Sequence, residues 1–248
     1  MIDFHTHILP GIDDGSKNIE MTEALLKEEQ KQGTDHIVAT PHFYAEQMSV
    51  QGFLERRAAA LAQTEAVRRK EAEETGLALP GITAGAEVYY FQGIGDAAEI
   101  PRLCLGETRT LLLEMPFQQW DEGVLRDVTR LIQKQKLHIV LAHLERYFEF
   151  QKKKAVWNEV LDLPLQFQLN AGSFLRRDSF FHPDKKKRFC MNFLEEHPDT
   201  ILGSDCHNMT GRRPNLAAGR RVIKEKFGAG ALDRIDTAAR TALATEFP

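Results

Sequence analysis

Short apolar runs rich in branched residues alternate along the chain with longer amphipathic stretches, which is the pattern of repeated β-α units around a parallel sheet. Two of the amphipathic stretches end at a glycine suited to cap a helix, Gly33 after MTEALLKEEQKQ and Gly76 after FLERRAAALAQTEAVRRKEAEET. We therefore expect an α/β fold in which each strand feeds a helix. Seven strands are predicted, one fewer than in the usual eight-stranded barrel, over residues 2–4, 36–40, 82–86, 110–114, 138–142, 165–170 and 200–203.

Nearly every predicted strand stops at a residue that can bind a metal ion. His5 and His7 lie two positions apart at the end of the first strand, so their side chains point to the same face. In a parallel sheet or barrel, groups at the carboxyl ends of the strands gather on one side, and residues far apart in sequence converge there. The candidate ligands are His5, His7, Asp14, His42, Glu87, Glu114, His143, Asp205 and His207, with Asp13 as the alternative to Asp14.

These nine candidates are too many for one ion with four to six ligands, whereas two or three ions that share a bridging carboxylate can use them. Individual positions have structural alternatives, such as a turn residue for His42 or a helix N-cap for Asp205. Glu114 follows three leucines, and a buried lone carboxylate is costly unless it is paired or binds a metal. Together the positions favour a polynuclear metal site. Structural roles are expected for the remaining histidines, His36, His138, His182 and His197.

Composition narrows the class of protein. With 248 residues, 42% hydrophobic and 27% charged, we expect one domain over residues 1–248, with two small domains as the alternative. A net charge of -4 argues against a nucleic-acid partner bound through overall basicity. No apolar run approaches the roughly 20 residues that span a bilayer, and the N-terminus lacks a signal-like pattern, so we expect a cytoplasmic protein with no membrane span.

The cysteines exclude one kind of metal site. Cys104, Cys190 and Cys206 are odd in number and widely spaced, so they form neither a disulfide framework nor a cysteine-based zinc site. Any metal must be held by histidines and carboxylates.

Six motifs in order give the chain a family resemblance: HTHILPGIDDG, ATPHF, GAEVYY, LLLEMPF, AHLERY and GSDCHN. Together they resemble the PHP (polymerase and histidinol phosphatase) superfamily, and within it the manganese-dependent protein-tyrosine phosphatases of bacterial capsular and exopolysaccharide gene clusters. The similarity runs from Met1 to about Arg213. It implies a distorted seven-stranded (β/α)7 TIM-like barrel, the PHP fold. The tail DRIDTAARTALATEFP departs from the family because it lacks the expected Asn-Pro turn.

The resemblance also implies three divalent cations, with Mn²⁺ favoured and iron, zinc or magnesium as alternatives. In the family's arrangement Glu87 is shared by two of the ions. One ion takes His5, His7, Glu87 and Asp205, a second takes Glu87, Glu114 and His143, and a third takes Asp14, His42 and His207.

The implied chemistry is the attack on phosphorus of a hydroxide that bridges two metal ions, because metal binding lowers the pKa of water. The resemblance assigns Arg146 and Arg212 to phosphate binding or transition-state stabilisation, and surface ion pairs are the alternative. Tyrosinate is a comparatively good leaving group, since the pKa of a phenol is about 10. Aryl phosphates should therefore react faster than alkyl phosphates.

A rival chemistry lies in the same stretch, because Cys206 and Arg212 fit the C-x5-R spacing of cysteine-dependent tyrosine phosphatases. Asp205, directly before the thiol, opposes thiolate formation and phosphate approach, and the loop has a single glycine to expose its amides. The sequence therefore favours the metal-dependent mechanism.

Two basic runs, residues 152–154 and 176–188, are expected to be solvated surface. For the second run, the alternative is a rim of the site that attracts an anionic substrate. Aromatic residues near it are candidates to grip a substrate ring or to anchor the loop in the barrel wall, namely Phe174, Phe180 and Phe181.

Three functions follow from these observations. The leading one is metal-dependent hydrolysis of phosphotyrosine in proteins, with the tyrosine-rich tail of a bacterial autokinase that controls polysaccharide export as the implied substrate and partner. The second is a small-molecule phosphomonoesterase of the histidinol-phosphatase type. The third is a non-catalytic metal-binding interaction module. Assays on a panel of phosphate esters with different metals separate the three.

Overall fold

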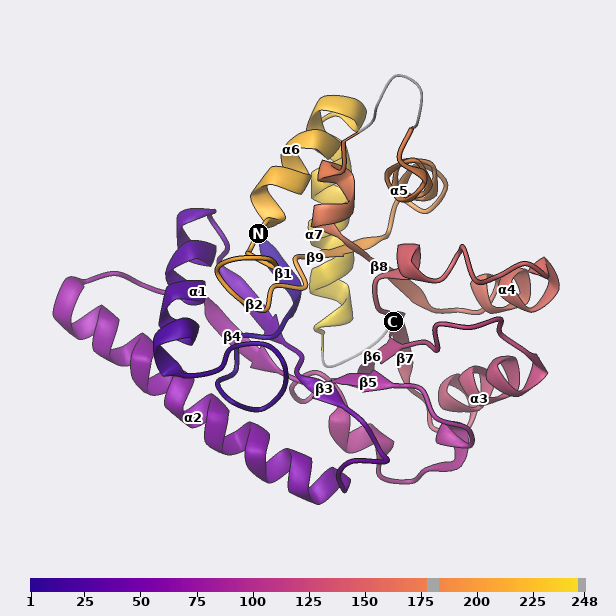
Figure 1. The fold of residues 1–248 in the computed structure, drawn as a ribbon, viewed down its shortest axis with the longest axis horizontal. Helices are drawn as coiled ribbons and strands as arrows, with labels where there is room; N and C mark the ends of the chain where they lie inside the picture. Colours follow the sequence, from indigo (N-terminus) through magenta and orange to yellow (C-terminus); the bar gives the residue numbers. More distant parts are fainter. Residues whose placement is uncertain (178–182, 245–248) are drawn as a thin grey trace.

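A computed structural model describes residues 1–177 and 183–244, and its path is drawn in Figure 1. All pairs of neighbouring strands within this part of the chain are parallel. The strands are β1 (Ile2–Thr6), β2 (His36–Ala39), β3 (His42–Phe43), β4 (Gly81–Ala84), β5 (Glu87–Tyr89), β6 (Thr110–Glu114), β7 (His138–Leu141), β8 (Gln166–Asn170) and β9 (Ile201–Gly203). They form two sheets, ordered β1-β2-β4 and β3-β5-β6-β7-β8-β9. The α/β class expected from the sequence is confirmed.

Helices follow most strands and cover the outside of the sheets (Figure 1). Gly76 ends the second helix in the left-handed conformation with φ 71°, as the sequence predicts. The first helix ends two residues before Gly33, which has φ 84°. The helices are α1 (Ile19–Lys31), α2 (Val50–Thr75), α3 (Glu122–Gln133), α4 (Lys154–Leu161), α5 (Lys185–Glu196), α6 (Leu216–Phe227) and α7 (Ala229–Ala242), with short 3-10 turns η1 (Ile94–Asp96), η2 (Ile100–Leu103), η3 (Leu144–Arg146) and η4 (Ala171–Leu175).

Two of the expected strands are each divided into two short ones. Residues 36–40 correspond to β2 with β3 beyond it, and residues 82–86 lead from β4 into β5. Hydrogen bonds continue across the interruption, from the Gly85 amide to the Ala39 carbonyl (2.8 Å) and from the Glu87 amide to the Pro41 carbonyl (3.0 Å). Pro41 has no amide hydrogen to continue the ladder, and a side chain at Gly85 would meet Leu105 at 2.3 Å. The two sheets therefore stay connected by hydrogen bonds across these interruptions.

The free edge of β1 lies against the chain that follows β9. Thr6 and Cys206 form a parallel bridge, the His7 amide donates to the Cys206 carbonyl (2.9 Å), and the Asp205 amide donates to the His5 carbonyl (2.8 Å). Because β1 contacts β2 on its other edge, the carboxyl ends of strands from both sheets surround one face.

Apolar side chains fill the space beneath that face. An inner cluster of buried residues combines Phe4, Val38, Leu112 and Val140 from four strands with alanines of α7. On β6, Leu112 belongs to the inner cluster, whereas Leu111 and Leu113 pack in the outer core. The divergent tail of the sequence thus supplies α7, whose alanines Ala238, Ala239 and Ala242 pack under the strands. None of the helices in residues 1–177 and 183–244 combines the length and the apolar character needed to cross a bilayer.

Candidate metal centre

Glu87 lies at the centre of the candidate site, at the start of β5. Its side chain is fully buried, although a lone buried carboxylate is costly. Its Oε2 atom lies 3.2 Å from His5 Nε2, 3.3 Å from His7 Nε2 and 2.9 Å from His42 Nδ1. Its Oε1 atom lies 2.7 Å from His143 Nε2. One carboxylate therefore contacts four imidazoles from three separate segments of the chain.

Glu114 and His143 come from the ends of neighbouring strands and face Glu87. Glu114 ends β6, and its Oε1 atom lies 3.4 Å from His143 Nε2 while its Oε2 atom lies 3.7 Å from His42 Nδ1. His143, one residue before η3, has the rare positive φ of 32° for a residue with a side chain. This conformation turns the chain directly after β7, where the imidazole meets both carboxylates.

The two aspartates after β1 have different environments. Asp13 is buried and accepts hydrogen bonds from the amides of Gly15 (2.9 Å) and His42 (3.0 Å), and its Oδ2 atom lies 2.7 Å from His7 Nδ1. Asp14 is 65% exposed, and its Oδ1 atom lies 3.3 Å from His207 Nε2 and 3.6 Å from His42 Nε2. Asp13 thus orients His7 from behind, and Asp14 is the one that faces other candidate ligands.

Asp205 joins the histidines to the two candidate phosphate-binding arginines. Its Oδ1 atom lies 3.4 Å from His7 Nε2 and accepts a 2.7 Å hydrogen bond from Arg212. Its Oδ2 atom accepts hydrogen bonds from Arg146 and from Asn170 Nδ2, the latter at 2.9 Å. The arginine side chains are 29% (Arg146) and 37% (Arg212) exposed, so both guanidinium groups reach the surface beside the cluster.

The nine candidate ligands therefore come together from β1, β3, β5, β6 and the turns after β1, β7 and β9. Three groups of ligand atoms are compact enough to hold an ion, with all atoms of a group within 4.8 Å of one another. Glu87 belongs to two of these groups. The groups are His7, Asp14, His42 and His207; His5, His7 and Glu87; and His42, Glu87 and Glu114.

This division resembles the one expected from the sequence but is not identical to it. The group with Asp14 gains His7, and His42 takes the place of His143 beside Glu87 and Glu114. Asp205 lies beside the second group, 3.7 Å from His5 Nε2. The assignment of each ligand to a particular ion stays a prediction.

Several polar atoms of the cluster are buried and have no hydrogen-bond partner. These are Glu87 Oε2, His42 Nδ1 and His207 Nε2. His5 and His7 also present their Nε2 atoms to each other at 3.1 Å, an arrangement in which two neutral imidazoles that both expose lone pairs repel. Imidazole nitrogens and carboxylate oxygens that converge in this way suit manganese, iron or zinc. The donor set therefore fits divalent cations.

The charges of the buried groups are set by one another. Burial would raise the pKa of Glu87, but the charge of His5 and a hydrogen bond to His143 hold it well below its ordinary value. Burial and Arg146 act to lower the pKa of His143, but hydrogen bonds to Glu114 and Glu87 raise it to about 9. Burial lowers the pKa of His207 to about 3, so this imidazole is neutral at pH 7. A cation that binds His143 must displace its proton.

Supporting residues around the cluster were not found from the sequence. Gln168 Oε1 lies 3.0 Å from His5 Nδ1 and accepts a 2.8 Å hydrogen bond from the His143 amide. The Tyr147 hydroxyl lies 3.0 Å from His143 Nδ1. The polar alternation of QFQLN in β8, which puts Gln168 and Asn170 on one face, is the signal that could have found two of them.

The cysteine alternative is disfavoured by the environment of Cys206. Its side chain is fully buried, and its Sγ atom lies 3.8 Å from Glu29 Oε1. Burial, Glu29 and Asp3 raise the pKa of this thiol well above its ordinary value. A protonated, buried thiol is a poor nucleophile.

The second basic run reaches the arginines. Arg176 and Lys186 line a cavity of about 230 Å³ together with Arg146 and Arg212. Of the two roles considered for Phe174, its full burial contradicts the grip on a substrate ring and agrees with the loop anchor. Phe180, Phe181 and His182 lie outside the described residues.

The other histidines among the described residues lie apart from the cluster. His36 and His138 begin β2 and β7, at the end of the strands opposite to the candidate ligands. His197 caps α5 and stacks on Phe193 with ring centroids 4.1 Å apart.

The fold and the site together define a parallel α/β protein with a candidate polynuclear metal centre at the carboxyl ends of its strands. The chain belongs to the CpsB/CapC family of capsular polysaccharide synthesis, whose family model matches residues 1–243. This confirms the relationship that the six sequence motifs indicate.

Named relatives include tyrosine-protein phosphatase CpsB of Streptococcus agalactiae, which is 31% identical over 235 residues, with 92% of this chain and 91% of that protein covered. CpsB of Streptococcus pneumoniae is 28% identical over 232 residues, with 92% of each covered. Tyrosine-protein phosphatase YwqE of Bacillus subtilis is 26% identical over 236 residues, with 92% of this chain and 85% of that protein covered.

The fold is also similar to a solved structure. A crystal structure from work on YwqE of Bacillus subtilis and CpsB of Streptococcus pneumoniae, unique metal-dependent tyrosine phosphatases, matches with a TM-score of 0.78. The match covers 98% of this chain and 94% of that chain at 23% identity, which supports the fold.

Proposed function

We propose that this protein is a metal-dependent phosphatase that hydrolyses phosphotyrosine in proteins. The observation that carries the proposal is the convergence of buried imidazoles on Glu87, with Oε2 of that carboxylate left without a hydrogen-bond partner. Membership of the CpsB/CapC family and relatives named tyrosine-protein phosphatases support it.

The nine candidate ligands would hold the cations, and three ions of manganese are the proposed number and kind. When bound, divalent cations of this type activate water as a nucleophile and neutralise charge on a phosphoryl group. Asp13 and Gln168 hold the rings of His7 and His5 from behind, since each contacts the Nδ1 atom of its histidine. Ligand rings fixed in this way keep their Nε2 atoms directed into the site.

Arg146 and Arg212 would bind the phosphoryl oxygens. Both guanidinium groups donate to Asp205, and each has further N–H groups for a substrate. A planar guanidinium suits the two-point recognition of phosphate, and its charge stabilises the phosphoryl group during transfer. The leaving tyrosinate needs little protonation, so the site requires no strong general acid.

The scaffold of this site is proposed to be a distorted seven-stranded (β/α)7 barrel that occupies the single domain 1–248. If β2 with β3 and β4 with β5 each count as one interrupted strand, the nine strands reduce to seven. The contacts of β1 with β2 and with the chain after β9 support a closed arrangement.

The proposed biological substrate is a phosphotyrosyl protein of capsule synthesis, with a bacterial tyrosine autokinase as the expected partner and the cytoplasm as the expected location. The family assignment to capsular polysaccharide synthesis supports this context.

A metal-dependence assay tests the proposal. The protein is treated with a chelator, its metal content is measured, and it is then reloaded separately with Mn²⁺, Fe²⁺, Zn²⁺ and Mg²⁺. Each form is assayed on a phosphotyrosyl peptide, a phosphoseryl peptide of the same sequence and histidinol phosphate. We expect loss of activity after chelation, recovery with Mn²⁺, and fastest hydrolysis of the phosphotyrosyl peptide.

Other results would favour the alternatives. Faster hydrolysis of histidinol phosphate supports a small-molecule phosphomonoesterase, and no turnover with any metal supports a non-catalytic binding module. Activity that survives chelation but disappears in Cys206→Ser would restore the cysteine mechanism.

A further inference from the structure

Two of the large apolar side chains exposed in the described part of the chain lie beside the candidate metal centre. Phe117 is 39% exposed and Phe150 is 43% exposed. Phe117 follows Glu114 by three residues on the loop after β6, and Phe150 follows His143 by seven residues on the segment before α4. Single exposed apolar residues are ordinary, but these two touch, with ring centroids 6.2 Å apart and planes at 63°.

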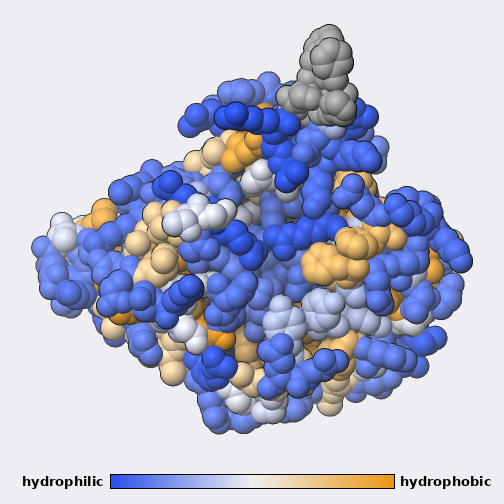
Figure 2. All heavy atoms as spheres, viewed as in Figure 1, coloured by the Kyte–Doolittle hydropathy of each residue, from blue (hydrophilic) through white to orange (hydrophobic). Residues whose placement is uncertain are grey.

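The pair is continuous with the candidate ligands. The ring of Phe117 stacks on His143, with centroids 6.2 Å apart and planes at 18°, and it packs on Tyr147 at 5.3 Å. His143 in turn points its Nε2 atom at Glu87 and Glu114. Figure 2 shows an apolar patch to the right of the centre of this mostly polar face, over the segments that lead into α3 and α4. Only the ring of His143 therefore separates Phe117 from the carboxylates of the candidate metal centre.

The loop that carries Phe117 is held rigidly. The Met115 amide donates to the Tyr147 hydroxyl (3.1 Å), and the Pro116 carbonyl accepts from the Trp120 indole (3.1 Å). On the other side of Phe117, the Gln118 carbonyl accepts from Gln151 Nε2 (2.8 Å). An exposed ring on a fixed backbone loses little conformational entropy when a ligand binds to it.

We propose that Phe117 and Phe150 form an aryl-binding wall, which stacks on the ring of the phosphotyrosine while its phosphate lies at the metal centre. This inference rests on the proposed function and names the part of the site that selects an aromatic ester. Arg146 follows His143 by three residues, so the phosphate-binding group and the wall flank the same imidazole. An alkyl phosphate has no ring to pack on the wall and gains nothing from it.

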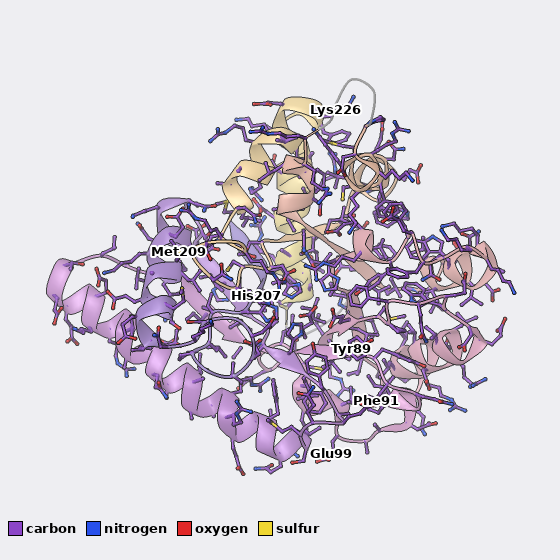
Figure 3. All side chains as sticks on the ribbon, in the orientation of Figure 1. Tyr89, Phe91, Glu99, His207, Met209 and Lys226 are labelled. Atoms are coloured by element: carbon purple, nitrogen blue, oxygen red, sulfur yellow. The ribbon has the colours of Figure 1, made fainter. Side chains whose placement is uncertain are left out.

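A neighbouring cavity, lined by Tyr44 and Tyr89, offers a competing place for the ring. Tyr44 packs on His42 at 5.3 Å and on Tyr89 at 5.6 Å. Tyr89 on β5 and His207 after β9 are labelled near the middle of the same face in Figure 3. The two tyrosines are less exposed than the phenylalanines, so less of their ring surface is available. Substitution of Tyr89 therefore tests this neighbouring cavity.

The test is a measurement of binding with two phosphonates that differ only in the ring. Phenylphosphonate and methylphosphonate are titrated by calorimetry into the manganese-loaded protein, for the wild type and for Phe117→Ala, Phe150→Ala, Phe117→Tyr, Tyr89→Ala and Leu175→Ala. Leu175 is the matched control, because it is an apolar residue with the same 39% exposure at the end of η4. Thermal melting of each variant checks that it is folded.

We expect Phe117→Ala and Phe150→Ala to raise the dissociation constant of phenylphosphonate roughly three- to tenfold, and to leave that of methylphosphonate unchanged. Phe117→Tyr keeps a ring and should bind like the wild type, as should Leu175→Ala. Equal affinity of the wild type for both phosphonates, or no binding of either, would overturn the wall. So would a loss of phenylphosphonate binding in Tyr89→Ala alone.

Two further results separate this inference from the proposed function. If the wild type prefers phenylphosphonate through Phe117 but does not hydrolyse phosphotyrosyl peptide, the wall stands and the proposed function fails. If Phe117→Ala weakens only a phosphotyrosyl protein and not phenylphosphonate, the wall binds a neighbouring residue of the protein, and the inference fails while the function stands.

Discussion

The histidines at the two ends of the parallel strands have the same chemistry but opposite environments. β7 begins at His138, and two residues after its last residue comes His143. Burial lowers the pKa of His138 to about 4, and its Nδ1 atom lies 3.3 Å from the hydroxyl of Thr110. Hydrogen bonds to Glu114 and Glu87 raise the pKa of His143 to about 9 despite its burial. The carboxylates at the carboxyl ends of the strands make the difference.

The same strands carry apolar side chains beneath the site and charged side chains at their carboxyl ends. Beneath the site, Phe4, Leu112 and Val140 pack against the alanines of α7 in an apolar layer. At the carboxyl edge, the same strands end in charged groups that burial would penalise if they had no counter-ion. Stability is therefore concentrated at one end of the strands and reactivity at the other, as is general for parallel α/β barrels.

The largest loss of activity is expected when the charge of the central carboxylate, Glu87, is removed. Glu87→Gln should lower kcat/KM for a phosphotyrosyl peptide by more than ~100-fold and reduce the number of bound metal ions, because a change in a group behind the ligands already costs about 10–100-fold. Metal content and steady-state rates measure both effects.

Asp127→Asn is the control for Glu87→Gln. Asp127 is also a buried carboxylate, but it accepts hydrogen bonds from Tyr90 and from the Gly93 amide on the outside of the sheet. Unchanged metal content in Glu87→Gln, or an equal loss of activity in Asp127→Asn, would contradict the central place of Glu87.

A smaller effect is expected behind His7. Asp13→Asn keeps the size of the side chain but removes the charge that faces His7 Nδ1 at 2.7 Å. Metal affinity should fall about 10–100-fold, and excess Mn²⁺ should restore much of the activity. Asp14→Asn should resist such rescue more strongly, because Asp14 faces His207 and His42 directly. Metal titrations of the two variants, followed by activity, make the comparison. If excess Mn²⁺ restored Asp14→Asn more fully than Asp13→Asn, Asp13 would be the metal ligand and Asp14 the supporting residue.

The smallest effect on activity is expected at the amino end of β7, where the change concerns stability instead. The pKa of His138 is about 4 in the folded protein against an ordinary value of 6.5, so between these values the unfolded chain binds more protons. Stability that His138 contributes at pH 7 is lost as the pH falls through 6.5 towards 4, up to about 3 kcal/mol. His138→Gln should therefore flatten the pH dependence of the free energy of unfolding in that range and leave activity at pH 7 within about twofold.

Denaturant unfolding of wild type and variant at several pH values measures this effect. Parallel curves for the two proteins between pH 4 and pH 6.5 would show that His138 does not titrate as its burial implies.

The sequence by itself determined the class of the fold and the set of candidate ligands. Strands of branched residues such as those around Leu111 end at acids and histidines, and parallel strands place their ends on one side, so the convergence at Glu114 and His143 follows from local pattern alone. The identity of Asp14 as the aspartate facing other ligands was left open, because both aspartates occupy the same loop and sequence carries no distances.

Only the tertiary structure decided which atoms meet and what supports them. Gln168 reaches His5 and the His143 amide from a distant strand, and Tyr147 connects His143 with the loop of Phe117. Such contacts join residues whose own segments show no sign of each other, since side-chain hydrogen bonds and ring packing depend on how elements are placed in space. The register of β3 on β5, in which His42 lies opposite Glu87 and the Pro41 carbonyl accepts from the Glu87 amide, likewise exists only in the folded sheet.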